Sequence, residues 1–283
     1  MTTIPVEKLL HVNQVLDDFD AANHFYEDVF GAEIYMNSYH EAEERDASLF
    51  VIGDTCIELF SPRTATSLLG RNLARYGNSW HSFEWKVPDL EAAKTALEER
   101  GVRLGSYYAG SFLMTHPKDT HGMLLEMCPS EMANDPRLAP GWSADRWRTD
   151  HPLGIRGLNA LGVAVRDLGA AGTFLEGLVG AHEVLRRDRD RIGARSAAFR
   201  VADHVIELNQ PEGEGVLASF VDQFGPRLRS IELEVESVAR AASYLEEKGV
   251  GVIEGDDEGT IALDPGDNYG VRYQLSEQNP FGR

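Results

Sequence analysis

Two glutamates of this 283-residue chain stand where apolar strands would bury their charge. Glu58 follows Ile57 and precedes Leu59 in DTCIELF, and Glu126 has the same kind of setting in LLEMC. Because side chains alternate along a strand, each carboxylate faces away from its apolar neighbours. An ionised carboxylate on a covered sheet face is unfavourable by several kcal/mol unless it is paired or binds a metal. Both glutamates are therefore candidates for a cation site.

His11 is placed to share that site. In HVNQVLDD, Leu16 comes just before the expected helix cap Asp18 and belongs on the helix side, so His11 faces the opposite side of the sheet. Imidazole and carboxylate oxygens together suit Zn, Ni, Co, Fe or Mn. One such residue alone is equally well explained as a polar group at a strand end. The joint placement of all three favours a divalent metal ion.

The elements that would position these residues recur along the chain. Residues 11–33 (HVNQVLDDFDAANHFYEDVFGAE) align with residues 160–182 (ALGVAVRDLGAAGTFLEGLVGAH), and the same offset places DTCIELFSP on DHVIELNQP. This self-similarity predicts two domains, residues 1–133 and 153–283. The segment between them, residues 134–152, is rich in Pro, Asp and Trp and predicts a linker.

Each half contains a shorter pattern twice. Residues 11–33 alternate as a strand and then change at Asp18 to helical apolar spacing that ends at Gly31. HSFEWKVPDLEAAKTALEERGV repeats this, with Asp89 as the N-cap and Gly101 at the end. Two or three strands follow each strand and helix. We predict an α+β fold of four βαβββ units, which pair to form two cupped sheets that can each hold a ligand.

These segments resemble the vicinal oxygen chelate superfamily, which includes glyoxalase I, methylmalonyl-CoA epimerase, extradiol dioxygenases and drug-sequestering resistance proteins. The resemblance spans nearly all of the chain outside the linker. It is strongest in the first half, where HPKDTHGMLLE is similar to the closing segment of the epimerases. The resemblance implies two glyoxalase-like cupped-sheet domains and a divalent metal ion bound by His11, Glu58, His81 and Glu126.

His81 departs from the superfamily pattern by one position. Counting back from the helix cap, as in the first strand, leads to Ser82, so strict alternation turns His81 toward the helix. A β-bulge would turn it back into the cup, and we predict one here. Without the bulge, Glu84 becomes the charge on this strand that faces the cup.

The second half lacks the full ligand set. Its corresponding residues are Ala160, Glu207, Arg229 or Ser230, and Gln274, which cannot form an ordinary site of histidines and carboxylates. We expect this half to be a structural or lid-forming partner. Pairing of units across the halves would divide the four candidate ligands between two cups, so we expect the units to pair within the first half.

Resemblance to glyoxalase I and the epimerase implies a metal-dependent isomerase or lyase that moves a proton next to a metal-chelated carbonyl. Glu58 or Glu126 would transfer that proton, and the charged run YHEAEERD offers alternative bases. Two other functions remain open. One is an Fe(II) extradiol-type ring-cleaving dioxygenase that uses His11, His81 and Glu126. The other is a non-catalytic protein that binds a drug or metabolite.

Composition narrows the choice of partners. Forty-six acidic and 27 basic residues give a formal charge of −19, which repels nucleic acids and anionic membranes. No apolar stretch approaches the roughly 20 residues of a membrane span, and MTTIPVEKLL lacks the apolar core of a signal peptide. Cys56 and Cys128 lie in apolar runs, as buried thiols of cytoplasmic proteins do. We expect a cytoplasmic location and a small-molecule substrate, with a homodimer as one option for assembly.

Overall fold

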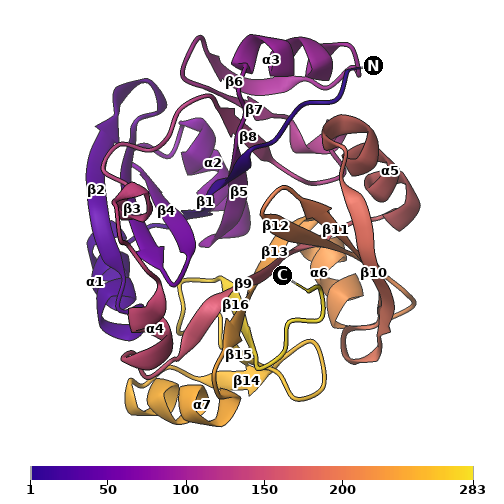
Figure 1. Ribbon diagram of the computed structural model, residues 1–283. Helices are drawn as coiled ribbons and strands as arrows, with labels where there is room; N and C mark the ends of the chain where they lie inside the picture. Colours follow the sequence, from indigo (N-terminus) through magenta and orange to yellow (C-terminus); the bar gives the residue numbers. More distant parts are fainter. Residues whose placement is uncertain (1, 283) are drawn as a thin grey trace.

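The computed structural model describes residues 2–282, which form two eight-stranded curved sheets, one from each half of the chain (Figure 1). The strands of the first sheet, in their order across it, are β2 (Glu33–His40), β3 (Arg45–Ile52), β4 (Thr55–Pro62), β1 (Lys8–Val15), β5 (Ser79–Lys86), β8 (Leu125–Cys128), β7 (Phe112–Thr115) and β6 (Leu104–Tyr108).

The second sheet repeats this order. Its strands are β10 (His182–Arg189), β11 (Ala194–Val201), β12 (His204–Pro211), β9 (Ile155–Ala164), β13 (Arg227–Val235), β16 (Arg272–Ser276), β15 (Ile261–Leu263) and β14 (Val252–Glu254).

Each sheet consists of two βαβββ units whose first strands pair antiparallel, β1 with β5 and β9 with β13. The predicted α+β fold with four such units is therefore confirmed, and the units pair within each half. The helices are α1 (Phe19–Phe30), α2 (Leu68–Tyr76), α3 (Leu90–Glu98), α4 (Asp145–Thr149), α5 (Leu168–Val179), α6 (Val216–Phe224) and α7 (Val238–Glu247). Four one-turn helices are η1 (Glu41–Glu43), η2 (Pro117–Asp119), η3 (Pro136–Leu138) and η4 (Asp190–Ile192).

The unit helices begin at the aspartates that the sequence indicates. The Asp18 carboxylate accepts a hydrogen bond from the Ala21 backbone N–H at 3.2 Å, and Asp89 accepts one from Ala92 at 2.9 Å. Helix α1 then ends at Gly31, whose φ of +61° is the left-handed conformation that glycine adopts without steric cost. These local signals fix where each unit changes from strand to helix.

Helices α1, α3, α5 and α7 lie around the periphery of the molecule in Figure 1. Their buried residues and the adjoining faces of both sheets form one apolar cluster that includes Tyr26, Trp80 and Tyr273. The Trp80 and Tyr273 rings lie 5.2 Å apart across the junction between the halves. The concave faces do not join this cluster. The first cup has a smaller one, in which Leu69 of α2 packs with Val15 and Phe60.

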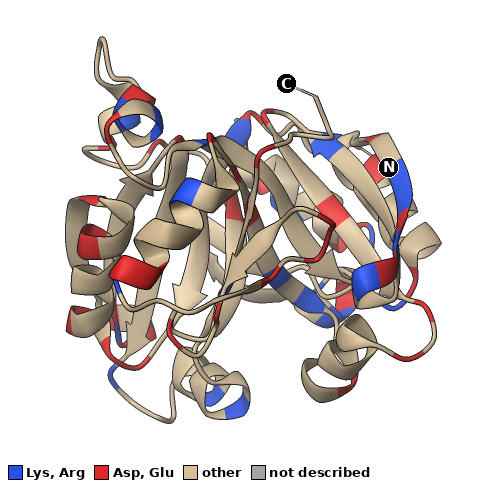
Figure 2. Cartoon of the chain, turned by 90° about the horizontal axis from the view of Figure 1, so that it is seen from below, with Lys and Arg blue, Asp and Glu red and all other residues tan. Residues whose placement is uncertain are grey.

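The segment between the sheets packs on the first half. Trp147 of α4 is 1% exposed, and its Nε1 donates to the Phe30 carbonyl at 3.0 Å. The domain limits at residues 134 and 152 stay a prediction. In the view of Figure 2, acidic and basic positions are interspersed over helices, strands and loops. None of the helices in residues 2–282 is long and apolar enough to cross a lipid bilayer.

Candidate metal centre

Strand register places one histidine and three glutamates on the concave face of the first sheet. His11 of β1 lies directly opposite Glu84 of β5, and Glu84 lies beside Glu126 of β8. On the other side, Glu58 of β4 pairs with Asn13, two residues along from His11. Because paired residues project to the same face of a sheet, these side chains converge on the cup.

The distances between these groups fit a shared cation. His11 Nε2 lies 3.0 Å from Glu58 Oε2 and 3.2 Å from Glu84 Oε2. His11, Glu84 and Glu126 each offer one ligand atom, and these three atoms lie within 4.8 Å of one another. All four side chains are buried, with residue exposures of 2% to 7%. Histidine and carboxylate donors that meet in this way can hold a divalent metal ion.

Two further buried residues orient the glutamates. Asn13 Nδ2 donates to Ser82 Oγ and to Glu126 Oε2, both at 2.7 Å. Arg45 Nη1 donates to Glu58 Oε1 at 3.3 Å, and Arg45 Nε donates to Glu43 Oε2 at 2.7 Å. Asn13 therefore positions Glu126, and Arg45 positions Glu58.

The charges of the cup are unbalanced without a cation. Burial raises the pKa of Glu84 and of Glu126 well above the usual range, and repulsion between the carboxylates adds to the shift. Burial would also raise the pKa of Glu58, but its interactions with Arg45 and His11 outweigh burial and lower that pKa. Within residues 2–282, neither ring nitrogen of His11 nor Oε2 of Glu84 has a hydrogen-bond partner. These residues fit a divalent ion, which would bind the unpartnered nitrogen and oxygen atoms and offset the repulsion between the carboxylates.

His81 lies at a β-bulge, which the sequence predicted at this position. Gln14 pairs with Trp80 and Asn13 pairs with Ser82, so His81 is the extra residue of β5. His81 Nδ1 lies 3.0 Å from Ser82 Oγ, and its ring lies 6.0 Å from that of Phe60. Its nitrogens are not among the three converging ligand atoms. Burial, with the nearby charges of Arg227 and Arg45, lowers the pKa of His81 to about 3, so the imidazole is neutral.

The structure thus brings together His11, Glu58 and Glu126 of the predicted set and adds Glu84, while the role of His81 as a ligand stays a prediction. Sequence reasoning did not assign roles to Asn13, Ser82 or Arg45. Strand parity could have identified the first two, because Asn13 shares the orientation of His11 and Ser82 is the residue to which alternation led. Arg45 lies in a charged run that resembles an exposed loop, and only the fold shows that it is 5% exposed.

A cavity of about 340 Å³ adjoins the cup. Leu69 of α2, Tyr108 of β6 and Met114 of β7 provide apolar walls, and His81 and Glu43 provide polar ones. Met114 pairs with Glu126 on the neighbouring strand, and Glu43 accepts from Arg45, so both walls adjoin the candidate metal centre. A small molecule in this cavity would approach the cluster from the side of the α2 helix.

The second cup differs at the matching positions. Ala160 and Gln274 flank Glu232, where the first cup has His11 and Glu126 on either side of Glu84. Glu207, the counterpart of Glu58, forms ion pairs with Arg187 and Arg189. The second half therefore has no equivalent of the His11 group among its described residues, as the sequence indicated.

Comparison with known proteins gives matches in both halves. Residues 10–113 match one family model and residues 157–272 match a second, and both are described as the glyoxalase/bleomycin resistance protein/dioxygenase superfamily. No functionally curated protein is significantly similar in sequence.

Three solved structures illustrate the range of similar folds. A triple mutant of 4-hydroxymandelate synthase from Streptomyces coelicolor is 14% identical, with a TM-score of 0.73 over 96% of this chain and 92% of that chain. The 2,3-dioxygenase LapB from Pseudomonas sp. KL28 is 17% identical, with a TM-score of 0.62 over 99% and 96%. Methylmalonyl-CoA epimerase from Mycobacterium tuberculosis is 26% identical, with a TM-score of 0.42 over 49% and 97%. The first two share the fold of both halves.

Proposed function

Because the chain belongs to the glyoxalase/bleomycin resistance protein/dioxygenase superfamily, we propose that its first half is a metal-dependent isomerase or lyase that transfers a proton next to a chelated carbonyl group. The observation that carries this proposal is the convergence of His11, Glu84 and Glu126, whose ligand atoms lie within 4.8 Å of one another. Glu58, 3.0 Å from His11 Nε2, completes the proposed set. The proposed ion is divalent, and the donors suit Zn, Ni, Co, Fe or Mn.

A divalent ion bound here would offset the negative charge that develops on a carbonyl oxygen when the adjacent carbon loses a proton. Glu58 is the proposed base. Arg45 and His11 lower its pKa, so its carboxylate is ionised and can accept a proton at Oε2. Glu126 is the second candidate for this role, and Asn13 Nδ2 fixes the position of its Oε2.

The composition of the cluster favours this chemistry over Fe(II)-dependent ring cleavage. A ring-cleaving site of the predicted type needs two histidines and one carboxylate. The converging group contains one histidine and two carboxylates, and His81 Nδ1 contacts Ser82 Oγ instead. The donor set is therefore richer in carboxylate oxygen than the dioxygenase alternative requires.

The cavity supports a small substrate with an apolar part. Its volume is about 340 Å³, and Leu69, Tyr108 and Met114 offer apolar contacts. Neither Lys nor Arg is among the described residues that line it. A carrier with several phosphates, such as a coenzyme A thioester, would find no counter-charge there. We therefore favour a free carbonyl compound, one that is not attached to coenzyme A or a similar carrier, as the substrate.

Elemental analysis of the purified protein tests the metal centre. We expect about one divalent ion per chain, and a loss of at least about tenfold in bound metal for His11→Ala and Glu126→Ala, because each change removes a ligand. The control is Glu27→Ala, which removes a carboxylate that is half exposed and lies outside the cluster. Circular dichroism would verify that each variant is folded. Unchanged metal content in both ligand variants would refute the site.

The reaction is tested separately. Small ketones and aldehydes would be incubated with the metal-loaded protein in D2O, and proton NMR would detect deuterium at the carbon next to the carbonyl. Because Glu58 also belongs to the proposed ligand set, exchange would be expressed per bound metal ion, and its disappearance in Glu58→Gln on that scale would support Glu58 as the base. Rapid oxygen consumption with catechols and Fe(II) would instead establish the dioxygenase. Tight binding of an aromatic compound by metal-free protein would indicate a non-catalytic binding protein.

A further inference from the structure

The second cup has glutamates, Glu207 and Glu232, at two of the four positions that match the candidate metal centre, and uncharged residues at the other two. Glu232 of β13 lies opposite Ala160 on β9 and beside Gln274 on β16. Neither neighbour carries a charge, so Glu232 is the one carboxylate among these three strand positions. The cup must satisfy that carboxylate in another way.

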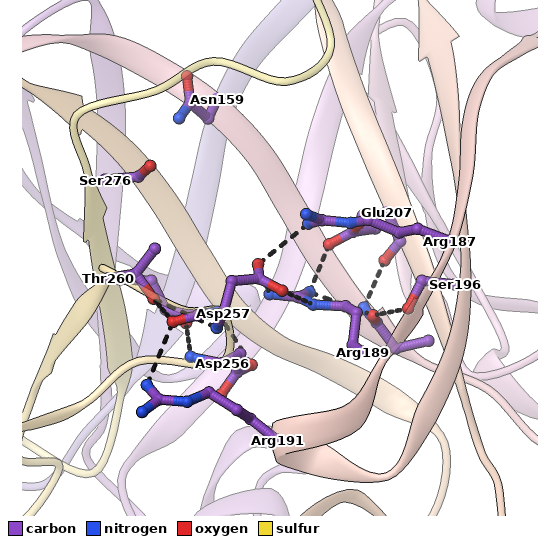
Figure 3. A network of polar contacts seen from close by, with 12 residues as sticks. Asn159, Arg187, Arg189, Arg191, Ser196, Glu207, Asp256, Asp257, Thr260 and Ser276 are labelled. Carbon is purple, nitrogen blue, oxygen red and sulfur yellow. Dashed lines mark hydrogen bonds and ion pairs between the residues drawn. The ribbon is translucent and has the colours of Figure 1, made fainter.

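Two arginines from β10 enter the same cup (Figure 3). Arg187 Nε donates to Glu207 Oε1 at 3.0 Å, and Arg187 Nη2 donates to Asp257 Oδ2 at 3.1 Å. Arg189 Nη2 donates to Asp257 Oδ2 at 2.6 Å, and Arg189 Nη1 donates to Glu207. Two guanidinium groups thus balance two carboxylates, and both arginines are committed to this network.

Glu232 takes part in none of these pairs, nor in the neighbouring one in which Arg229 and Arg272 both pair with Asp256. Glu232 is 5% exposed, and within residues 2–282 no hydrogen bond or ion pair engages its carboxyl group. Burial raises its pKa to about 7, and the charge of Glu207 contributes to the rise. The opposing charges that act on it are those of Arg189 and Arg187, which the network already pairs with Glu207 and Asp257.

This carboxyl group lines a cavity of about 500 Å³ at the mouth of the second cup. Thr260 and Ser276 add hydroxyl groups to its wall, Val238 and Ala239 of α7 add apolar surface, and Glu258 and Glu277 lie exposed at its rim. An unpaired buried carboxyl group that faces open space, with acidic residues around the entrance, is the arrangement that attracts a cation with hydrogen-bond donors.

We infer that the second cup binds a small organic ammonium compound, whose protonated amine pairs with Glu232. The ammonium places a positive charge in direct contact with Glu232, which none of these arginines does, and its N–H groups donate to the carboxylate. A metal ion fits poorly because Ala160 and Gln274 offer no second charged ligand. An anion fits poorly because Arg187, which lines the cavity, and Arg189 behind it both already bind Glu207 and Asp257.

Isothermal titration calorimetry of the full chain tests this inference with three probes of equal length: 1,4-diaminobutane, 1,4-butanediol and succinate. The titrations would be run at about 0.15 M salt. At low ionic strength the charge of −19 would attract any cation non-specifically, and salt screens this attraction. We expect saturable binding of one diamine per chain and none of the diol or of succinate. Glu232→Gln should weaken diamine binding at least about tenfold, because it removes the counter-charge.

Two variants separate the site from general effects. Ala239→Trp leaves Glu232 in place but puts an indole into the cavity mouth from an exposed position, so it should also abolish binding. Glu84→Gln, the matched change in the first cup, should reduce bound metal and leave diamine binding intact. Equal diamine binding by Glu232→Gln, preference for succinate, or no binding of the diamine to the wild-type chain would each overturn the inference.

Discussion

One residue type at equivalent strand positions has different surroundings in the two halves. Glu84 faces His11 and Glu126, whereas Glu232 faces Ala160 and Gln274. Burial raises the pKa of both glutamates. Their neighbours decide the consequence, because several donors can share a divalent ion while a lone carboxyl group can bind only a proton or a single cationic group.

His81 gives a prediction at this scale. Because its Nδ1 contacts Ser82 Oγ and its ring lines the cavity, His81→Gln should leave bound metal within about twofold of wild type and should alter mainly the KM for substrate. Elemental analysis and steady-state kinetics measure the two effects, with His11→Ala as the variant that loses metal. A loss of metal in His81→Gln equal to that in His11→Ala would instead establish His81 as a ligand.

Glu232 gives a prediction about pH. Its pKa is raised from 4.5 to about 7 in the folded chain, so between these values the folded state binds more protons than the unfolded state. Stability from this group therefore falls as pH rises through that range, by at most about 1.4 kcal/mol per pH unit. Urea unfolding of wild type and Glu232→Gln at several pH values should show a smaller fall in the variant. Parallel stability curves would refute the shifted pKa.

Strand β5 decides more of the site than any other element. It provides Ser82 and Glu84 to the cup and places Trp80, Phe83 and Trp85 in the core. The bulge at His81 allows Trp80 on one side of it and Ser82 on the other to stay paired with β1. Helix caps act independently of this, because each involves only a side chain and a backbone N–H three residues later. A change at a helix cap should therefore alter the stability of the protein without altering the geometry of the candidate metal centre.

The cap of α3 provides the corresponding test. Asp89→Ala removes the acceptor for the Ala92 N–H, so it should reduce the free energy of unfolding by about 1 kcal/mol. Asp20→Ala, which removes an exposed acidic residue in the first turn of α1 without a cap bond, should cost only a few tenths of a kcal/mol. Urea unfolding measures both. Bound metal should stay unchanged in both variants, and a metal loss in Asp89→Ala would contradict the separation.

At the scale of the whole molecule, the two halves share one apolar core. Trp80 packs on Tyr273, and Trp85 Nε1 donates to His204 Nε2 at 3.0 Å across the junction. Separation of the halves would expose these rings to water, at a cost of about 25 cal/mol for each Å² of apolar surface. The repeat is visible as two sheets, and we expect the pair of halves to be the stable unit because they share this core.

A truncated chain tests this point and the predicted domain limit. Residues 1–133 alone should lack cooperative unfolding or should self-associate, because the face that includes Trp80 loses its cover. Size-exclusion chromatography and thermal circular dichroism distinguish these outcomes from independent folding. A monomeric fragment with a sharp transition and full metal content would show that the first half is an autonomous domain.

The sequence by itself determined the repeated units, the helix caps and the orientation of His11, Glu58 and Glu126, because periodicity and capping depend on residues close together in the chain. It also located the irregularity at His81. Only the tertiary structure decided which side chains converge, since Glu84 joins His11 through the register of β1 against β5. The same holds for the second cup. There, arginines on β10 neutralise Glu207 and Asp257 and leave Glu232 unpaired, and that balance of charge depends on residues up to 70 positions apart.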